Sequence, residues 1–159
     1  MMARYNSWQN QSLFGAADTL SNDQRQGDHG AFWGSIHGTL NHILWGDQIW
    51  MSRFNTTPTP LAPNQPHSPH DLATWDGLKQ ARFEFDQTIE AWSERLTDDW
   101  LRADLTWYSG GAGRDVTKPK WILVTHFFNH QTHHRGQVHC LLTQAGAKPE
   151  DTDLFLRAD

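Results

Sequence analysis

The segment His126 to Gln137, which reads HFFNHQTHHRGQ, carries four of the chain's ten histidines. His130 and His134 are four residues apart, so one helix places both imidazoles on the same face, where they can reach a single metal ion. His126 extends the row by one turn, but it would lie about 12 Å from His134 along the helix axis. A single ion can therefore take only a neighbouring pair of histidines from this segment, and its other ligands must come from elsewhere.

These histidines interrupt a helical stripe that is otherwise apolar. At about 100° per residue, the stripe consists of Leu123, Phe127, His130, His134, Gln137 and Leu141. Such a stripe normally faces a core, and imidazole and amide groups are costly to bury without partners. A bound metal ion explains the three polar positions. The alternative is a polar network, or surface histidines beside one histidine in the core.

A third ligand is expected from a helix predicted over residues 34–54. His42 lies beside the apolar face of this helix, with Gly38 and Gly46 one turn to either side. Glycine inside a helix is unfavourable, so the two glycines indicate either free space around an imidazole or close helix packing around a core histidine. If His42 joins the pair from the other segment, the three histidines leave further positions open to water. That pattern is typical of catalytic rather than structural zinc sites.

Apolar periodicity and turn residues predict four amphipathic helices in a single domain over residues 1–159. They are expected over residues 3–20, 34–54, from Ser68 and Pro69 to Leu96, and 119–146. A proline-rich linker over residues 55–69 is long enough for the third helix to run parallel to the second. The glycine-rich segment 103–118 predicts a small hairpin or loop before the last helix. The expected fold class is all-α, a four-helix bundle with a long Pro-rich crossover, on which the tail 151–159 packs back.

Composition excludes several classes of partner. The net charge of −5 and the pI near 6.0 argue against nucleic acid or an anionic membrane as partner. No apolar run approaches the roughly 18 residues of a membrane span, and the N-terminus MMARYNSWQNQ has no apolar signal segment. The single cysteine, Cys140, allows no internal disulfide. We therefore expect a soluble, cytoplasmic protein.

Two segments carry a resemblance to a known family. GAFWGSIHGTLNHILWGDQIW and HFFNHQTHHRGQVHCLLTQAG closely resemble the DinB-like family, the damage-inducible, YfiT-like four-helix-bundle proteins that are regarded as metalloenzymes. The resemblance covers nearly the whole chain. It places the histidine of LNHIL at His42 and the pair of NHQTHH at His130 and His134. His126 and His133 do not match ligand positions and are candidates for the wall of the site or for supporting contacts.

The resemblance also implies a class of activity. Some family members resemble thiol-dependent transferases, which join a low-molecular-weight thiol such as bacillithiol, mycothiol or glutathione to an electrophile. Others resemble a thiol-linked isomerase, and members often form homodimers. An imidazole site suits a divalent transition metal rather than Mg²⁺ or Ca²⁺. One ion per chain is expected, Zn or Ni first, with Fe or Mn as the other choices.

The leading hypothesis is a metal-dependent enzyme of the thiol S-transferase or hydrolase type, acting on a small-molecule substrate. Its metal would activate water or a thiol. Asp47 and Gln137 can orient ligands or substrate, and for Asp47 a hydrogen-bond partner is favoured over a base. Arg135 can hold an anionic group or, because it points off the stripe, lie exposed or at an interface. No catalytic residue is assigned. The alternatives are a non-enzymatic, metal-binding or stress-associated dimeric bundle, and a buried polar network without metal.

Overall fold

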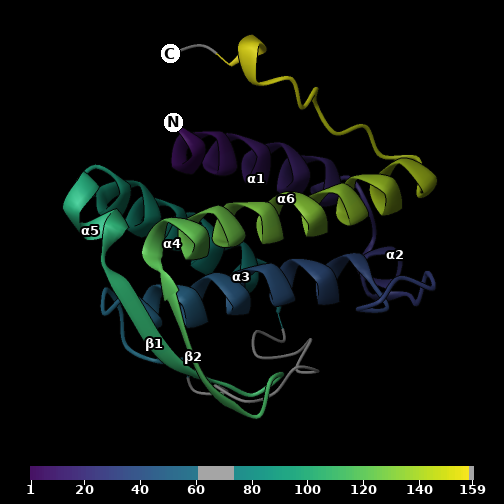
Figure 1. Cartoon of the computed structure of the whole chain (residues 1–159). Helices are drawn as coiled ribbons and strands as arrows, with labels where there is room; N and C mark the ends of the chain where they lie inside the picture. Colours follow the sequence, from purple (N-terminus) through teal and green to yellow (C-terminus); the bar gives the residue numbers. More distant parts are fainter. Residues whose placement is uncertain (61–73, 158–159) are drawn as a thin grey trace.

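The computed structural model describes residues 1–60 and 74–157, and this part of the chain is mostly helical with one small sheet (Figure 1). The long helices are α1 (Met2–Asp18), α3 (Ile36–Arg53), α4 (Trp75–Ser93) and α6 (Lys120–Gln144). The shorter elements are α2 (Asn22–Gln26), α5 (Asp98–Arg102), β1 (Asp104–Ser109), β2 (Arg114–Pro119) and the 3-10 turn η1 (Leu154–Leu156). The all-α class is thus confirmed, with a two-stranded sheet added to it.

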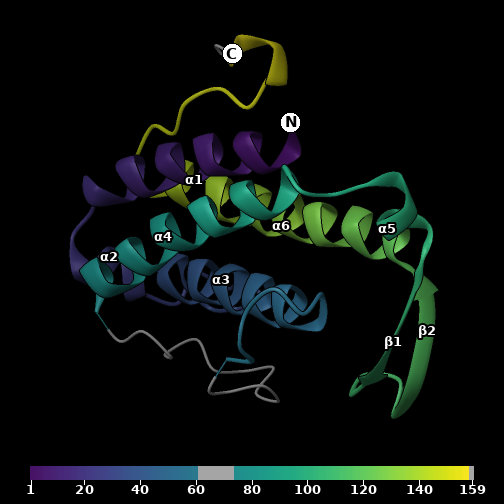
Figure 2. The same ribbon diagram turned by 90° about the vertical axis from the view of Figure 1, so that its left-hand side faces the viewer.

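The four long helices pack on one another. Helix α3 lies against α6 and α4, and α1 lies against α4 and α6. Helices α3 and α4 run in the same direction, as expected from the long connection between them (Figure 2). None of the described helices is long and apolar enough to cross a membrane.

The core of this helical body consists of two apolar clusters, one toward each end. The first contains Leu13, Ile36, Leu40, Leu78 and Leu142, and the second contains Met51, Ile89, Trp92, Leu123 and Phe127. Between the two clusters each long helix carries buried polar side chains, which are Asn6 and Asn10 on α1, Asp47 on α3, Arg82 and Asp86 on α4, and Gln131 and Arg135 on α6. We call these seven residues the polar layer. The histidines of α3 and α6 come from the same stretches of helix.

The two short helices were not expected from the sequence. Helix α2 begins with a capping box. The backbone N–H of Gln24 donates to Ser21 Oγ at 3.2 Å, and the backbone N–H of Ser21 donates to Gln24 Oε1 at 2.9 Å. Helix α5 is capped by Thr97, whose Oγ1 accepts from the Trp100 N–H at 3.2 Å. One turn of helix is too short to show an apolar period, so caps are the only local signal for both.

Helix α4 begins later than expected. Thr74 is its N-cap and accepts a hydrogen bond from the Gly77 N–H at 3.2 Å. The predicted start at Ser68 and Pro69 lies outside the described residues. In the sequence, apolar residues follow this helix at a 3-4 spacing that only Arg82 breaks, and the structure buries the Arg82 side chain fully. The apolar residues of this seam are Trp75, Leu78, Phe85, Ile89, Trp92 and Leu96.

The predicted hairpin before α6 is confirmed. Strands β1 and β2 pair antiparallel, with Trp107 opposite Val116. The hairpin descends from the start of α6 past the C-terminal end of α3 (Figure 1). Trp107 meets Trp50 of α3 there, with ring centroids 5.5 Å apart. The hairpin therefore forms part of the surroundings of that end of α3.

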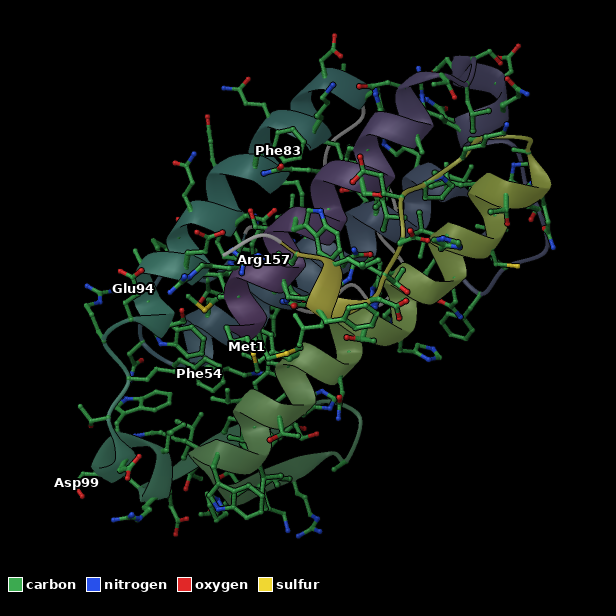
Figure 3. All side chains as sticks on the ribbon, turned by 90° about the horizontal axis from the view of Figure 1, so that it is seen from above. Met1, Phe54, Phe83, Glu94, Asp99 and Arg157 are labelled. Carbon is green, nitrogen blue, oxygen red and sulfur yellow. The ribbon has the colours of Figure 1, made fainter. Side chains whose placement is uncertain are left out.

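An aromatic cluster closes the same end of the body. Phe54, just after α3, stacks on Trp92 at 5.3 Å and meets Trp100 of α5 edge-on at 5.6 Å. In the view from above, Phe54 lies toward the end where α4 leads into α5, marked by Glu94 and Asp99 (Figure 3).

The tail runs over α1 and is tethered to it through its backbone. Tyr5 and Gln9 donate hydrogen bonds to the carbonyls of Thr152 and Asp151 at 2.7 and 3.0 Å. The apolar residues of η1 nevertheless remain exposed, and Phe155 is 81% accessible. The expectation that the tail packs back holds for its backbone and is wrong for these side chains.

Candidate metal centre

Helices α3 and α6 bring His42, His130 and His134 together. One ligand nitrogen from each of the three imidazoles lies within 4.8 Å of the others. The Nε2 atoms of His42 and His130 are 3.1 Å apart. Ring centroids are separated by 4.6 Å between His42 and His134 and by 4.5 Å between His130 and His134. Residues 88 positions apart in the chain thus meet at one point.

These separations suit a single transition-metal ion. Two nitrogens bound at about 2.0–2.1 Å to one tetrahedral ion lie about 3.3 Å apart, close to the spacing of His42 and His130. Within residues 1–60 and 74–157, no fourth histidine, cysteine or carboxylate joins this group. The three histidines therefore fit a metal site with at least one position left for another ligand.

Gln137 orients one of the three imidazoles. Its Oε1 lies 2.7 Å from Nδ1 of His134, one turn earlier on α6. An amide oxygen only accepts, so Nδ1 carries the proton and Nε2 of His134 keeps its lone pair for a metal. Support of this kind raises the basicity of a ligand and holds its ring. Gln137 thus has the ligand-orienting contact that the sequence proposed for it.

Trp33 covers one face of His42, a contact that the sequence did not reveal. The two rings stack with centroids 3.8 Å apart and planes 20° from parallel. Trp33 belongs to a short loop in which Ala31 and Gly34 form a bridge, and Gly34 adopts a φ of +73° that favours glycine. No periodicity marks a tryptophan in a loop, so only the folded chain places it here.

Gly46 lies against the imidazole of His130 on the facing helix. A Cβ atom at this position would lie 2.8 Å from Cε1 of His130, closer than side chains allow. The absence of a side chain therefore lets α6 approach α3 at the level of His130. Of the two readings of Gly46 left open by the sequence, this is close helix packing, and the histidine beside the glycine is His130 rather than His42.

Burial keeps the three histidines neutral. It lowers the pKa of His42 and of His130 to about 3, and neighbouring histidines add to the effect. Burial also lowers the pKa of His134, although its hydrogen bond to Gln137 opposes the shift. Neutral imidazoles have lone pairs for a metal without first losing a proton.

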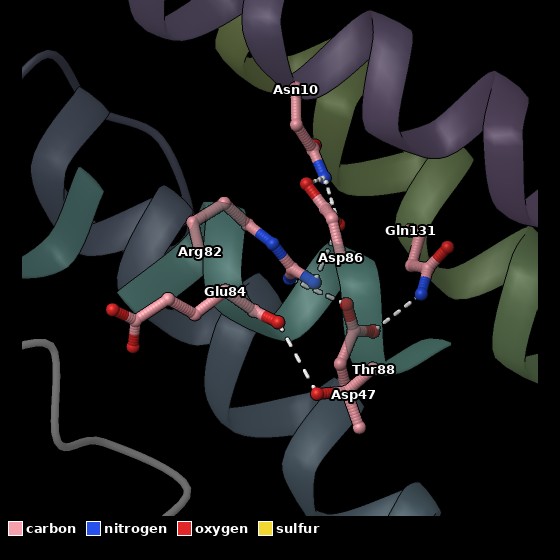
Figure 4. A network of polar contacts seen from close by, with 7 residues as sticks. All are labelled: Asn10, Asp47, Arg82, Glu84, Asp86, Thr88 and Gln131. Carbon is pink, nitrogen blue, oxygen red and sulfur yellow. Dashed lines mark hydrogen bonds and ion pairs between the residues drawn. The ribbon is translucent and has the colours of Figure 1, made fainter. Parts of the chain in front are cut away.

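Asp47 belongs to the polar layer and is buried, and Figure 4 shows its contacts with Arg82 and Gln131. Its Oδ2 lies 2.6 Å from Nη1 of Arg82, and its Oδ1 accepts from Gln131 Nε2 at 2.7 Å. Arg82 also pairs with Asp86 at 2.8 Å, and Asp86 accepts from Asn10 Nδ2 at 3.0 Å. Burial raises the pKa of Asp47 to about 6, although Arg82 and Gln131 oppose the shift. Asp47 is thus the hydrogen-bond partner favoured from the sequence, and it links three helices.

The other residues singled out in the sequence surround the cluster without joining it. His126 lies 6.0 Å from His130 and 5.1 Å from Trp50 between ring centroids. His133 meets His134 edge-on at 4.8 Å. Arg135 faces α1, where its guanidinium lies 5.7 Å from the ring of Tyr5.

The alternative of an exposed or interfacial Arg135 is wrong for this chain, because the residue is only 5% accessible. Arg135 lies on the α1 side of α6, as part of the polar layer. Burial lowers its pKa to about 10.

Fold and site together define a helical protein with a three-histidine cluster that suits a transition metal. The chain matches the model of the DinB family over residues 1–159, and it belongs to that family. It is 26% identical over 169 residues to Protein DinB of Bacillus subtilis (strain 168), with 96% of this chain and 90% of the relative covered.

A solved structure is also similar in fold. The crystal structure of a DinB-like protein from Bacillus cereus ATCC 10987 superposes with a TM-score of 0.66 at 18% identity. The match covers 91% of this chain and 90% of the other. At this level of identity the likeness shows the fold alone.

Proposed function

We propose that this DinB-family protein binds one divalent transition metal per chain through His42, His130 and His134, and that it is a metal-dependent enzyme. Zn or Ni is the first choice, with Fe or Mn as the others. The observation that carries the proposal is the meeting of three neutral imidazole nitrogens within 4.8 Å. A three-histidine set with a position left over is the donor arrangement of catalytic zinc sites.

The metal supplies Lewis acidity when bound, lowering the pKa of water or of a thiol so that a nucleophile is available near neutral pH. The chain's own residues prepare the site. Gln137 fixes the tautomer of His134, Gly46 leaves room for His130, and Trp33 covers His42 against solvent. The contacts of the polar layer fix the orientation of α3 relative to α6, so that the histidines of the two helices face one another.

The reaction class we propose is thiol S-transfer or hydrolysis on a small-molecule substrate, with a low-molecular-weight thiol as cosubstrate. Family membership supports this choice. The same proposal includes a four-helix bundle built from α1, α3, α4 and α6, a homodimer and a cytoplasmic location. The packing of the four long helices supports the bundle.

A non-enzymatic metal-binding protein is the second candidate. The shielding of the site favours it, because His42 and His134 are each only 8% exposed. The two candidates differ in one testable property. In an enzyme, the metal position not filled by histidine accepts added small molecules, whereas in a non-enzymatic site it does not.

Metal content tests the first step. Elemental mass spectrometry of the purified protein should find about one transition-metal ion per chain, lost in His42→Ala and in His130→Ala. His139→Ala is the matched control on the same helix, and it should keep its metal. Wild-type protein that stays metal-free after incubation with Zn²⁺ and Ni²⁺ would end the proposal. Azide or thiol binding to a Co²⁺-substituted site, followed by visible absorption, then separates an exchangeable site from a closed one.

A further inference from the structure

Arg53, the last residue of α3, is a cation held by aromatic rings. Its guanidinium carbon lies 4.6 Å from the ring centroid of Trp50 and 6.0 Å from that of Trp107 on the hairpin. Within the described part of the chain its side chain has neither a carboxylate partner nor a hydrogen bond. Three other buried or half-buried arginines have polar partners. Arg82 pairs with Asp47 and Asp86, Arg25 donates to backbone carbonyls, and Arg135 donates to Thr132 Oγ1.

The ring contacts leave the N–H donors of Arg53 without a hydrogen-bond acceptor among the described residues. A guanidinium carries five N–H donors in one plane, and this planar fork matches the two oxygens of a carboxylate. Arg53 is half-buried, so part of its side chain remains open to solvent. Holding the side chain against the two rings also removes much of the rotamer entropy that binding would otherwise cost. Arg53 is therefore a preorganised donor for a planar anion.

Arg53 is joined to the three-histidine site by a row of ring contacts. Trp50 meets His126 at 5.1 Å, and His126 meets His130 at 6.0 Å. Along α3, Arg53 lies two turns beyond Gly46, which adjoins His130, so the two points are about 10 Å apart along the axis. The hairpin lies at this end of α3 (Figure 1).

We propose that Arg53, with Trp50, Trp107 and His126, forms a carboxylate-binding subsite at the hairpin end of the three-histidine site. The substrate is then a small molecule whose carboxylate lies about 10 Å from the group that reaches the histidines. This second statement rests on the proposed metal function, whereas the subsite itself does not. A carboxylate fits better than a phosphate dianion, because Arg53 supplies a single positive charge and a planar pair of N–H donors that matches two carboxylate oxygens.

Binding of a carboxylate alone tests the subsite in the metal-free, full-length protein. Butyrate is titrated at constant ionic strength while the indole N–H resonances of Trp50 and Trp107 are followed by NMR. Saturable shifts are expected at both indoles, with affinity reduced about tenfold in Arg53→Gln. Arg53→Lys keeps the positive charge but loses the planar pair of N–H donors. Its affinity for butyrate should lie between those of wild type and Arg53→Gln. Arg4→Gln removes an exposed arginine from α1 and should bind butyrate as wild type does.

Three results would overturn the subsite. They are the absence of saturable shifts, equal butyrate binding in wild type and Arg53→Gln, and inorganic phosphate binding at least as tightly as butyrate. Melting temperatures of both Arg53 variants establish that they are folded before the comparison is made.

A second titration tests the spacing in zinc-loaded protein. Wild type should bind 6-mercaptohexanoate about tenfold more tightly than hexane-1-thiol. Arg53→Gln should bind the two thiols with equal affinity. A purely structural role for Arg53 predicts that the substitution weakens both thiols alike, and that outcome would overturn the proposal. If the protein takes up no zinc, the metal function fails while the butyrate titration still decides the subsite.

Discussion

Arg82 Nη1 lies 2.6 Å from Asp47 Oδ2, and each of these side chains is 1% exposed. The pair joins α4 to α3, and the other oxygen of Asp47 joins α3 to Gln131 of α6, the neighbour of His130. One carboxylate thus ties together the two helices that carry the three histidines. The polar layer lies between two apolar clusters, where an unpaired charge has little access to water.

Removing the cation of this pair should destabilise the protein strongly. Arg82→Met leaves Asp47 and Asp86 buried without their cation, and the free energy of unfolding should fall by about 3–5 kcal/mol. Urea denaturation followed by circular dichroism measures the change. Arg102→Met breaks an exposed pair with Asp98 and should leave stability unchanged within error. Equal stability of Arg82→Met and wild type would show that the pair does not hold the helices.

A methyl group at Gly46 should displace His130. The added Cβ would lie 2.8 Å from Cε1 of His130, so the imidazole or the helix must shift. Metal affinity, measured by competition with a chelator, should fall by roughly tenfold or more in Gly46→Ala. The matched control is Gly136→Ala, whose Cβ meets nothing within 4 Å. It should retain metal and gain about 0.5–1 kcal/mol in stability, because alanine is the better helix former.

Loss of the Gln137 amide should weaken metal binding without removing a ligand. In Gln137→Leu, Nδ1 of His134 loses its acceptor, and the ring is no longer held in one tautomer. The affinity for Zn²⁺ should fall by about 10–100-fold, the range typical for supporting residues of metal ligands. Gln144→Leu, on an exposed part of the same helix, should bind as wild type does. Unchanged affinity in Gln137→Leu would contradict the role of this hydrogen bond.

Acidification should destabilise the metal-free protein below about pH 6.5. The pKa of His42 and of His130 is lowered from 6.5 to about 3 by folding, so between these values the unfolded chain binds more protons than the native state. The contribution to stability is complete above pH 6.5 and is lost as pH falls toward 3. Asp47, with its raised pKa, acts in the opposite direction over a narrower range.

Denaturation of wild type and His42→Leu between pH 4 and 8 isolates this effect. The wild-type free energy of unfolding should fall on acidification by on the order of a few kcal/mol more than that of the variant. Parallel curves for the two proteins would contradict a lowered pKa of His42. Because the comparison uses metal-free protein, it does not depend on metal release.

Features carried by neighbouring residues were accessible from the sequence. The spacing of His130 and His134 follows from the helical period, and so does the burial of Leu123, Phe127 and Leu141 on the same stripe. The hairpin was predictable because its turn and its two strands are contiguous. The short helices α2 and α5 were not predicted, because one turn of helix shows no apolar periodicity. The capping box at Ser21 was nevertheless a usable signal for α2.

Tertiary structure decided the rest, because the remaining contacts join residues remote in the chain. Asp47 lies 35 residues from Arg82 and 84 from Gln131, and no local pattern pairs them. Arg82 looked like a break in an apolar seam. Asp86 lies one turn away on the same helix, but only the packing of α3 on α4 supplies Asp47. In the same way, Trp33 reaches His42 through a loop, and Gly46 makes room for a histidine on another helix. The sequence by itself determined which long helices form and which side chains can bind a metal, since both depend on residues within a few turns. The meeting of three imidazoles at one point required the packing of α3 on α6, which depends on the whole core.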